Sequence, residues 1–204
     1  SEGDREYTVA AINYEKPDMK ITKRDAMSGK PIAGTVLSVK SVTSSYSTSV
    51  TTGADGSATL SAIPAGVYVV REESVPEPYI VSNTEQTVAL RPGKTSEVIF
   101  VDYKKPGLEI LKKNIATGEP IEGVTYLIEQ IDGSYSTSAT TDSAGRIFLD
   151  SIPAGSYRIT EKNVPSHVIL SEIPQEIHLE AGCTRTVTFF NAVKPSLTVL
   201  KRNS

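Results

Sequence analysis

The sequence predicts an all-β protein made of two tandem β-sandwich domains. Three observations support this prediction: the chain repeats itself, its segments alternate apolar and polar residues, and Gly, Pro, Asp and Ser separate those segments. The chain has 204 residues, which is enough for two domains of about 100 residues each. No stretch keeps a helical period over about ten residues, so we expect strands and turns only.

The internal duplication has no gaps. The stretch "KPDMKITKRDAMSGKPIAG" at 16–34 recurs as "KPGLEILKKNIATGEPIEG", and "IPAGVY" at 63–68 recurs as "IPAGSY". Every match has the same offset of 89 residues, and 33 of the 89 aligned positions are identical. Such self-similarity is typical of tandem domains, and it predicts two complete repeats at 16–104 and 105–193.

The same phase continues on both sides of the two repeats. "KPSLTVLKRN" near the end matches the start of a repeat, and "REYTVAAINYEKP" near the beginning matches the last strand of one. We therefore expect residues 1–15 to hold a tag remnant ("SEG") and the end of a preceding repeat, and 194–204 to start a following one. Proline favours a short, extended and fairly stiff connection. The Lys-Pro pairs that mark the joints are at 16–17, 105–106 and 194–195.

Each repeat presents its strands and turns in the same order. In the first repeat the alternating segments are "MKITKRD", "VYVVRE" and "SEVIFVD", and the turns are "GADG", "IPAG" and "RPG". In the second repeat "RIFLD" and "SYRITE" show the same alternation. Successive side chains of a strand point to opposite faces of its sheet, so each segment has one face predicted to lie in the core.

Three polar residues of each repeat fall on this predicted core face. The core-face residues of the first repeat are Met19, Ile21 and Lys23, then Tyr68, Val70 and Glu72, then Val98, Phe100 and Asp102. The same parity in the second repeat selects Lys112, Glu161 and Asn191. Each repeat is thus predicted to aim a lysine, a glutamate and an aspartate or asparagine at its own core. In the partial repeats, Asn13 and Lys201 occupy the corresponding positions.

Two structural interpretations of these polar residues compete with a chemical one. A lysine can extend its amine from a strand end or protect an edge strand against aggregation. The three groups together could also form a buried ion pair with a neutral partner, although such a cluster is expensive to bury. Their recurrence in register in both repeats favours a chemical role.

The chemistry follows from the apolar surroundings. Burial lowers the pKa of an amine and raises that of a carboxyl group, so a buried lysine becomes a neutral nucleophile. A protonated aspartate or an asparagine amide offers an acceptor carbonyl, and a nearby glutamate can polarise it and transfer protons. Adjacent strands would hold these groups at high effective concentration. The pattern predicts an amide between side chains, made with loss of water from Asp102 or of ammonia from Asn191.

These motifs resemble a known family. "ITKRD" with "SGKPIAG", "AGVYVVRE" with a following proline, and "EVIFVDYKKP" are similar to Cna B-type (SpaA-like) repeat domains of Gram-positive surface proteins and pilins. The resemblance implies an Ig-like, transthyretin-like (prealbumin-like) β-sandwich. The sequence departs from the family in the loops "EESVPEPY" and "EKNVPSHV". In family members Gly-Tyr often follows the first proline of this loop, and here it does not.

The resemblance also implies an autocatalytic isopeptide bond between the first and last strands of each repeat. Carried over by position, it joins Lys23 to Asp102 with Glu72 as proton shuttle. In the second repeat it joins Lys112 to Asn191 with Glu161. Asn13 and Lys201, which lack complete partners in this chain, are expected to stay unlinked.

The function implied is that of stalk or spacer repeats of an extracellular, cell-wall-attached protein. The partners expected are neighbouring repeats of the same chain, and the chain is expected to be monomeric. One alternative is an adhesin module that binds a host matrix protein or glycan through the Ser/Thr tracts at 45–52 and 134–141. Another is a pilin shaft subunit, although neither a Tyr-Pro-Lys-Asn-like pilin motif nor a Leu-Pro-x-Thr-Gly sorting signal occurs in the sequence.

Composition argues against several other classes. A net charge of -3 and a pI near 5.5 do not suit a nucleic-acid partner, and no apolar run approaches the roughly 18 residues of a membrane span. Cys183 is alone, so we expect an incidental exposed thiol. His167 and His178 are isolated, so neither a metal site nor a cofactor is expected. Without a Ser-His-Asp set or a phosphate loop, we expect no enzyme activity beyond one turnover of bond formation.

Overall fold

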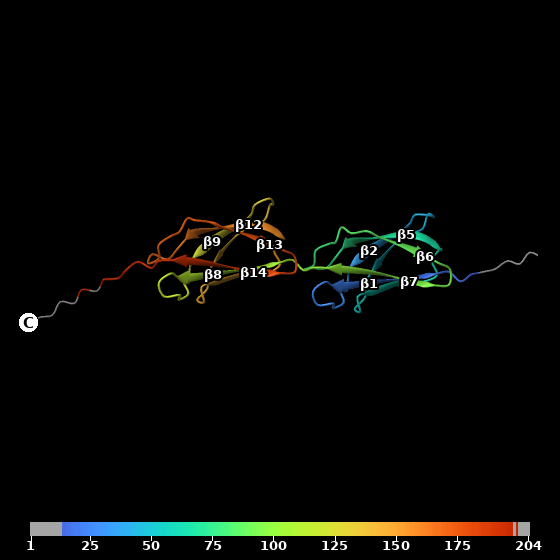
Figure 1. Cartoon of the computed structure of the whole chain (residues 1–204), viewed down its shortest axis with the longest axis horizontal. Coiled ribbons are helices and arrows are strands. Elements are labelled where there is room, and N and C mark those ends of the chain that lie inside the picture. Colours follow the sequence, from blue (N-terminus) through green and yellow to red (C-terminus); the bar gives the residue numbers. More distant parts are fainter. Residues whose placement is uncertain (1–13, 198, 200–204) are drawn as a thin grey trace, which may run out of the picture. The chain divides into compact units, whose positions relative to one another are not determined.

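The computed structural model describes residues 14–197 and 199, and the chain divides into two compact units, one ending at Asp102 and one starting at Tyr103 (Figure 1). All regular elements of the described residues are strands, so the predicted all-β class is confirmed. No helix in this part of the chain is long and apolar enough to cross a bilayer. Each unit is described by itself below.

The first unit consists of two sheets. One sheet has three strands in the order β4-β1-β7, and the other has four in the order β3-β2-β5-β6. The strands are β1 (Asp18–Asp25), β2 (Val36–Ser41), β3 (Ser47–Thr51), β4 (Ser57–Leu60), β5 (Gly66–Ser74), β6 (Gln86–Leu90) and β7 (Thr95–Asp102).

The second unit repeats this arrangement strand for strand. Its three-stranded sheet has the order β11-β8-β14, and its four-stranded sheet has the order β10-β9-β12-β13. The strands are β8 (Gly107–Asn114), β9 (Thr125–Gln130), β10 (Ser136–Thr140), β11 (Arg146–Leu149), β12 (Gly155–Asn163), β13 (Gln175–Leu179) and β14 (Thr184–Asn191).

The first and last strands of each unit lie side by side and run parallel. In the first unit Lys23 of β1 is paired with Phe100 of β7, and Asp25 with Asp102. Asp102 is therefore two residues beyond the partner of Lys23 and points to the same face of the sheet. In the second unit Lys112 of β8 has the same relation to Asn191 of β14, since its register partner is Phe189.

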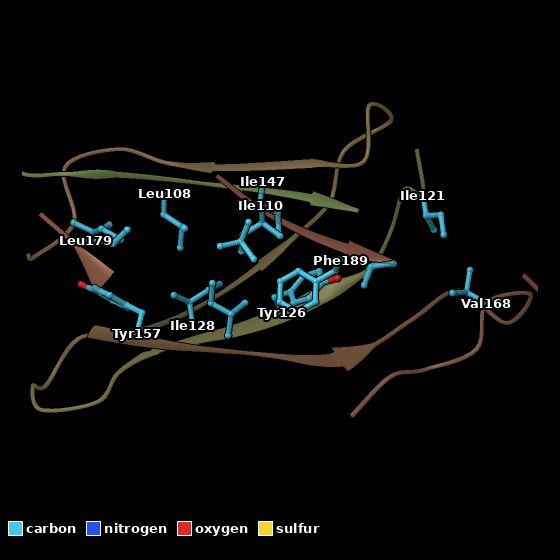
Figure 2. Close-up of a cluster of buried hydrophobic side chains, with 14 residues drawn as sticks. Leu108, Ile110, Ile121, Tyr126, Ile128, Ile147, Tyr157, Val168, Leu179 and Phe189 are labelled. Atoms are coloured by element: carbon cyan, nitrogen blue, oxygen red, sulfur yellow. The ribbon is translucent and has the colours of Figure 1, made fainter. Parts of the chain in front are cut away.

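The core of each unit lies between its two sheets. In the second unit Leu108 and Ile110 of the three-stranded sheet and Ile128 and Ile159 of the four-stranded sheet are fully buried, and Figure 2 shows Leu108 and Ile110 on the side of the core opposite Ile128. The first unit buries Met19, Ile21, Val39 and Val70 in the equivalent places. This burial removes apolar surface from water at about 25 cal/mol per Å² and drives the packing of the sheets.

A glycine turn fixes the backbone of each core lysine. The carbonyl of Gly56 accepts the amide N–H of Lys23 at 2.7 Å, and the carbonyl of Gly145 accepts that of Lys112 at 2.7 Å. Both glycines have positive φ angles of about 70°, and a Cβ at either position would collide with the lysine carbonyl. The lysine side chains therefore start from a fixed point of the sheet.

Candidate functional site

The first site is built from three different strands of one core. Lys23 comes from β1, Glu72 from β5 and Asp102 from β7, and their exposed fractions are 0%, 2% and 2%. The alternation in β7 explains why Asp102 points inward: Val98 and Phe100 are buried, whereas Ile99 and Val101 are half exposed. The three residues selected by strand parity are thus brought together.

The polar groups of the first site are in close contact, but several of them lack hydrogen-bond partners. The amine of Lys23 touches the carboxylate of Glu72 and lies 2.5 Å from Oδ1 of Asp102. Neither contact has the angles of a hydrogen bond, and within the described residues both oxygens of Asp102 lack a hydrogen-bond partner. Buried polar atoms without partners are costly, so two separate ionised groups fit this site badly. An amide would remove both charges and one of these oxygens.

The electrostatics of the first site favour an uncharged acceptor. Burial raises the pKa of the Asp102 carboxyl to about 6, partly opposed by the nearby amine of Lys23. Glu72 is held on its other side by the backbone N–H of Ser82, which donates to Oε2 at 2.7 Å. The ring of Phe100 lies 5.8 Å from the amine and helps to keep the site apolar. With this pKa about a tenth of the carboxyl groups are in the acid form at pH 7, far more than for an aspartate with its ordinary pKa.

The second site is built from the corresponding strands β8, β12 and β14, and its hydrogen bonds are more complete. Lys112, Glu161 and Asn191 are 1%, 3% and 3% exposed. The amine of Lys112 donates to Oε2 of Glu161 at 2.6 Å, and Nδ2 of Asn191 donates to Oε1 at 2.5 Å. Glu161 thus bridges the amine and the amide, while burial lowers the pKa of Lys112 and Glu161 partly offsets this effect. Within the described residues, Oδ1 of Asn191 has no hydrogen-bond partner.

Two kinds of hydrogen bond to the glutamate carboxylates were not predicted from the alternation of residues in the strands. The backbone N–H of Ser171 donates to Oε1 of Glu161 at 3.1 Å, as that of Ser82 does to Glu72. The hydroxyl of Tyr126 also donates to Oε2 of Glu161 at 3.1 Å. Figure 2 shows Tyr126 beside Phe189, and their ring centroids are 4.8 Å apart. The available signal was the inexact repeat, because Leu37 occupies the position of Tyr126 in the first unit.

The other residues singled out in the sequence lie apart from these sites. The Ser/Thr tracts form β3 and β10, which are edge strands of their sheets, and Ser47, Ser49 and Thr51 are exposed. Cys183 is half-buried and free. In the part of the chain that the structure describes, no three His, Cys, Asp or Glu residues are grouped so as to hold a metal ion. Asn13 and Lys201 lie outside the described residues.

The chain matches one protein family along most of its length. A family model described as a SpaA prealbumin-like fold domain matches it twice, at residues 17–104 and 106–193. A search of curated proteins found no match. The two matched segments account for both copies of the Lys-Glu-Asp/Asn set.

The chain is similar to several solved structures at low sequence identity, and a match with a TM-score above 0.5 shows the same fold. A mutant of the shaft pilin SpaA from Lactobacillus rhamnosus GG has a TM-score of 0.53 at 15% identity, covering 91% of this chain and 100% of the other. GBS52, the minor pilin of Streptococcus agalactiae, gives 0.46 at 17% identity, with coverages of 92% and 100%. The Bacillus anthracis TIE protein gives 0.47 at 21% identity; the match covers 88% of this chain but only 34% of that protein.

Proposed function

We propose, since the chain belongs to the SpaA family of prealbumin-like fold domains, that its two units are structural repeats of a Gram-positive surface protein, each locked by an isopeptide bond. The observation that carries this proposal is the buried Lys-Glu-Asp/Asn set, which each unit presents on its first, fifth and seventh strands. Most of the other buried side chains of each unit are apolar, and a buried ion pair in such surroundings is costly, so we interpret the set as reactants.

The proposed reaction needs no external reagent. In the first unit the amine nitrogen of Lys23 bonds to the side-chain carbonyl carbon of Asp102, the bond to one aspartate oxygen breaks, and water leaves. In the second unit Lys112 bonds to the carbonyl carbon of Asn191, and the amide nitrogen leaves as ammonia. Glu72 and Glu161 accept a proton from the amine and return one to the leaving group, so each ends as it began. The protein performs this reaction once.

The position of the bond suggests what it is for. The chain enters each unit at its first strand and leaves after its last, and these two strands are parallel neighbours. A bond between them would carry tension from one to the other without loading residues 24–101 or 113–190. Noncovalent strands would then have no need to resist the force. A stalk or spacer that holds another part of a surface protein away from the cell wall would benefit from this design.

Force spectroscopy tests the proposal. When the chain is pulled by its ends, each unit of the wild type should release almost no contour length, because its crosslink bypasses nearly the whole unit. The variant Lys23→Ala should add the length of the first unit, and Lys112→Ala that of the second. Full extension of both units in the wild type would contradict the proposal. A pilin shaft is a second candidate, supported by the fold shared with the shaft pilin, and a ladder of covalent multimers with a pilin sortase would favour it.

A further inference from the structure

The carboxylate of Glu161 has a more complete set of partners than that of Glu72. Its Oε2 accepts from Lys112 at 2.6 Å and from the hydroxyl of Tyr126 at 3.1 Å. Its Oε1 accepts from Nδ2 of Asn191 at 2.5 Å and from the N–H of Ser171 at 3.1 Å. A carboxylate has about four acceptor positions, so this one is fully occupied and has one orientation.

The first unit lacks two of these partners, the tyrosine hydroxyl and the amide of an asparagine. Leu37 replaces the tyrosine there, and both residues are fully buried at the same position of the fold. Glu72 receives the N–H of Ser82, while its Oε1 touches Lys23 without hydrogen-bond geometry. The unit with the tyrosine is the one with an asparagine acceptor, and the unit with the leucine is the one with an aspartate.

We propose that Tyr126 is a positioning residue for bond formation in the second unit: its hydroxyl holds Glu161 so that Oε2 faces the amine of Lys112 and Oε1 faces the amide nitrogen of Asn191. This inference rests on the proposed function. The bond from the amine of Lys112 to the carbonyl carbon of Asn191 forms as the bond to Nδ2 breaks. The proton lost by the amine leaves with Nδ2 as ammonia, and Glu161 passes it from one side to the other.

The chemistry of the two acceptors explains why only one unit needs this support. An amide is a weaker acceptor than a carboxylic acid, and its nitrogen leaves only when protonated, so the proton must be delivered at the right point. Burial and the adjacent Glu161 raise the pKa of Tyr126, so its hydroxyl stays protonated and remains a donor at neutral pH. Packing of its ring against Phe189, 4.8 Å between centroids, fixes the direction of the hydroxyl.

The test follows both reactions in one full-length chain. The protein is made in a short cell-free pulse and chased, and the fractions that have lost water and ammonia are measured by intact mass, with peptide mapping to assign each unit. Tyr126→Phe should slow ammonia loss about tenfold or more, as expected for a hydrogen bond to a charged group. Water loss from the first unit should keep its rate, which provides an internal control for synthesis and handling.

A second buried tyrosine supplies the matched control. The hydroxyl of Tyr157 donates to the carbonyl of Pro153 at 2.7 Å, and its residue is as fully buried as Tyr126. Tyr157→Phe therefore removes an equivalent hydrogen bond elsewhere in the same core, and it should leave the rate of ammonia loss unchanged. Denaturant unfolding of the two variants should show similar losses of stability, so slowing that is confined to Tyr126→Phe reports on the position of Glu161 and not on stability.

The outcomes separate the two proposals. If the wild type loses no ammonia, the proposed function fails. If the wild type loses ammonia and Tyr126→Phe does so at the same rate, or if Tyr157→Phe slows it equally, the positioning role is overturned. Tyr126→Leu, which copies Leu37 of the first unit, should show the same slowing and serves as the test if the phenylalanine variant does not fold.

Discussion

At the scale of the residue, the two glutamates account for the proposed chemistry most directly. Glu161 contacts both the amine and the acceptor amide of its unit, Glu72 contacts the amine of Lys23, and each belongs to a separate core. A glutamate that transfers protons is required for the rate of the reaction, not for the identity of the product. Its removal should therefore leave a folded unit whose amine and acceptor remain separate.

Two matched substitutions test this role. Glu72→Ala should retain the water of the first unit and still lose the ammonia of the second, while Glu161→Ala should do the reverse. Glu73→Ala is the control, since that neighbouring side chain is exposed and bonds Ser38. Intact mass distinguishes all three variants. Loss of both small molecules from Glu72→Ala would show that this glutamate is dispensable.

The two acceptors predict different responses to pH. Burial raises the pKa of Asp102 to about 6, so each pH unit above this value leaves roughly tenfold less of the acid form that can react. Asn191 does not titrate. The ratio of water loss to ammonia loss in a pulse-chase experiment should therefore fall as the chase pH is raised from about 6 to 8. A ratio that stays constant or rises across this range would contradict the assignment of Asp102 as an acid-form acceptor.

Strand parity predicted which residues face the core but not how they meet. Lys23, Glu72 and Asp102 were selected because each falls in phase with apolar neighbours. Those neighbours are buried in the core, so a residue in phase with them faces the core as well. The role of Tyr126 was beyond this reasoning, because a core-facing tyrosine is ordinarily an apolar residue with one polar atom. Its partner Glu161 is its register partner on the neighbouring strand β12, and alternation within one strand does not define which strands pair or in which register.

At the scale of the element, the turn before β4 in the first unit and the turn before β11 in the second unit position the lysines. Gly145 packs against the carbonyl of Lys112 and leaves no room for a Cβ. Gly118 has a similar φ, +76° against +67°, but nothing lies within 4 Å of the position of its Cβ. An alanine at Gly118 would therefore strain only the backbone, whereas an alanine at Gly145 would strain the backbone and also displace Lys112.

The corresponding alanine variants should differ accordingly. Gly118→Ala should lower the free energy of unfolding by about 1–2 kcal/mol through its left-handed backbone alone, with normal ammonia loss. Gly145→Ala should cost more and should also slow ammonia loss, because the strand that carries Lys112 must shift. Denaturant unfolding and mass time courses measure the two effects. Equal effects of both variants would mean that the turn does not position the lysine.

The turns and several strands were predictable from local sequence, whereas the strand order was not. "GADG", "IPAG" and "RPG" punctuate the chain as the structure has them, because glycine and proline act locally. The parallel pairing of β1 with β7 joins segments at opposite ends of a unit, and alternation contains no information about it. That pairing was expected only from the resemblance to known domains.

At the scale of the whole molecule, each crosslink should stabilise its own unit. A bond from Lys112 to Asn191 closes a loop of nearly the whole unit, and by analogy with disulfides this stabilises by about 4–5 kcal/mol through the unfolded state. Asn191→Ala removes the acceptor and leaves the Lys112–Glu161 pair in place. The free energy of unfolding of the second unit should fall by about 4–5 kcal/mol, while that of the first unit should not change. An unchanged second transition would mean that no crosslink stabilises this unit.

The central claim concerns covalent structure, and the intact mass of the purified wild-type chain tests it most directly. If both units are locked, the mass is lower than the sequence mass by one water and one ammonia, and the peptides that contain Lys23 and Asp102, and Lys112 and Asn191, are recovered as joined pairs. A mass equal to that of the sequence, with these four residues in separate peptides, would contradict the account.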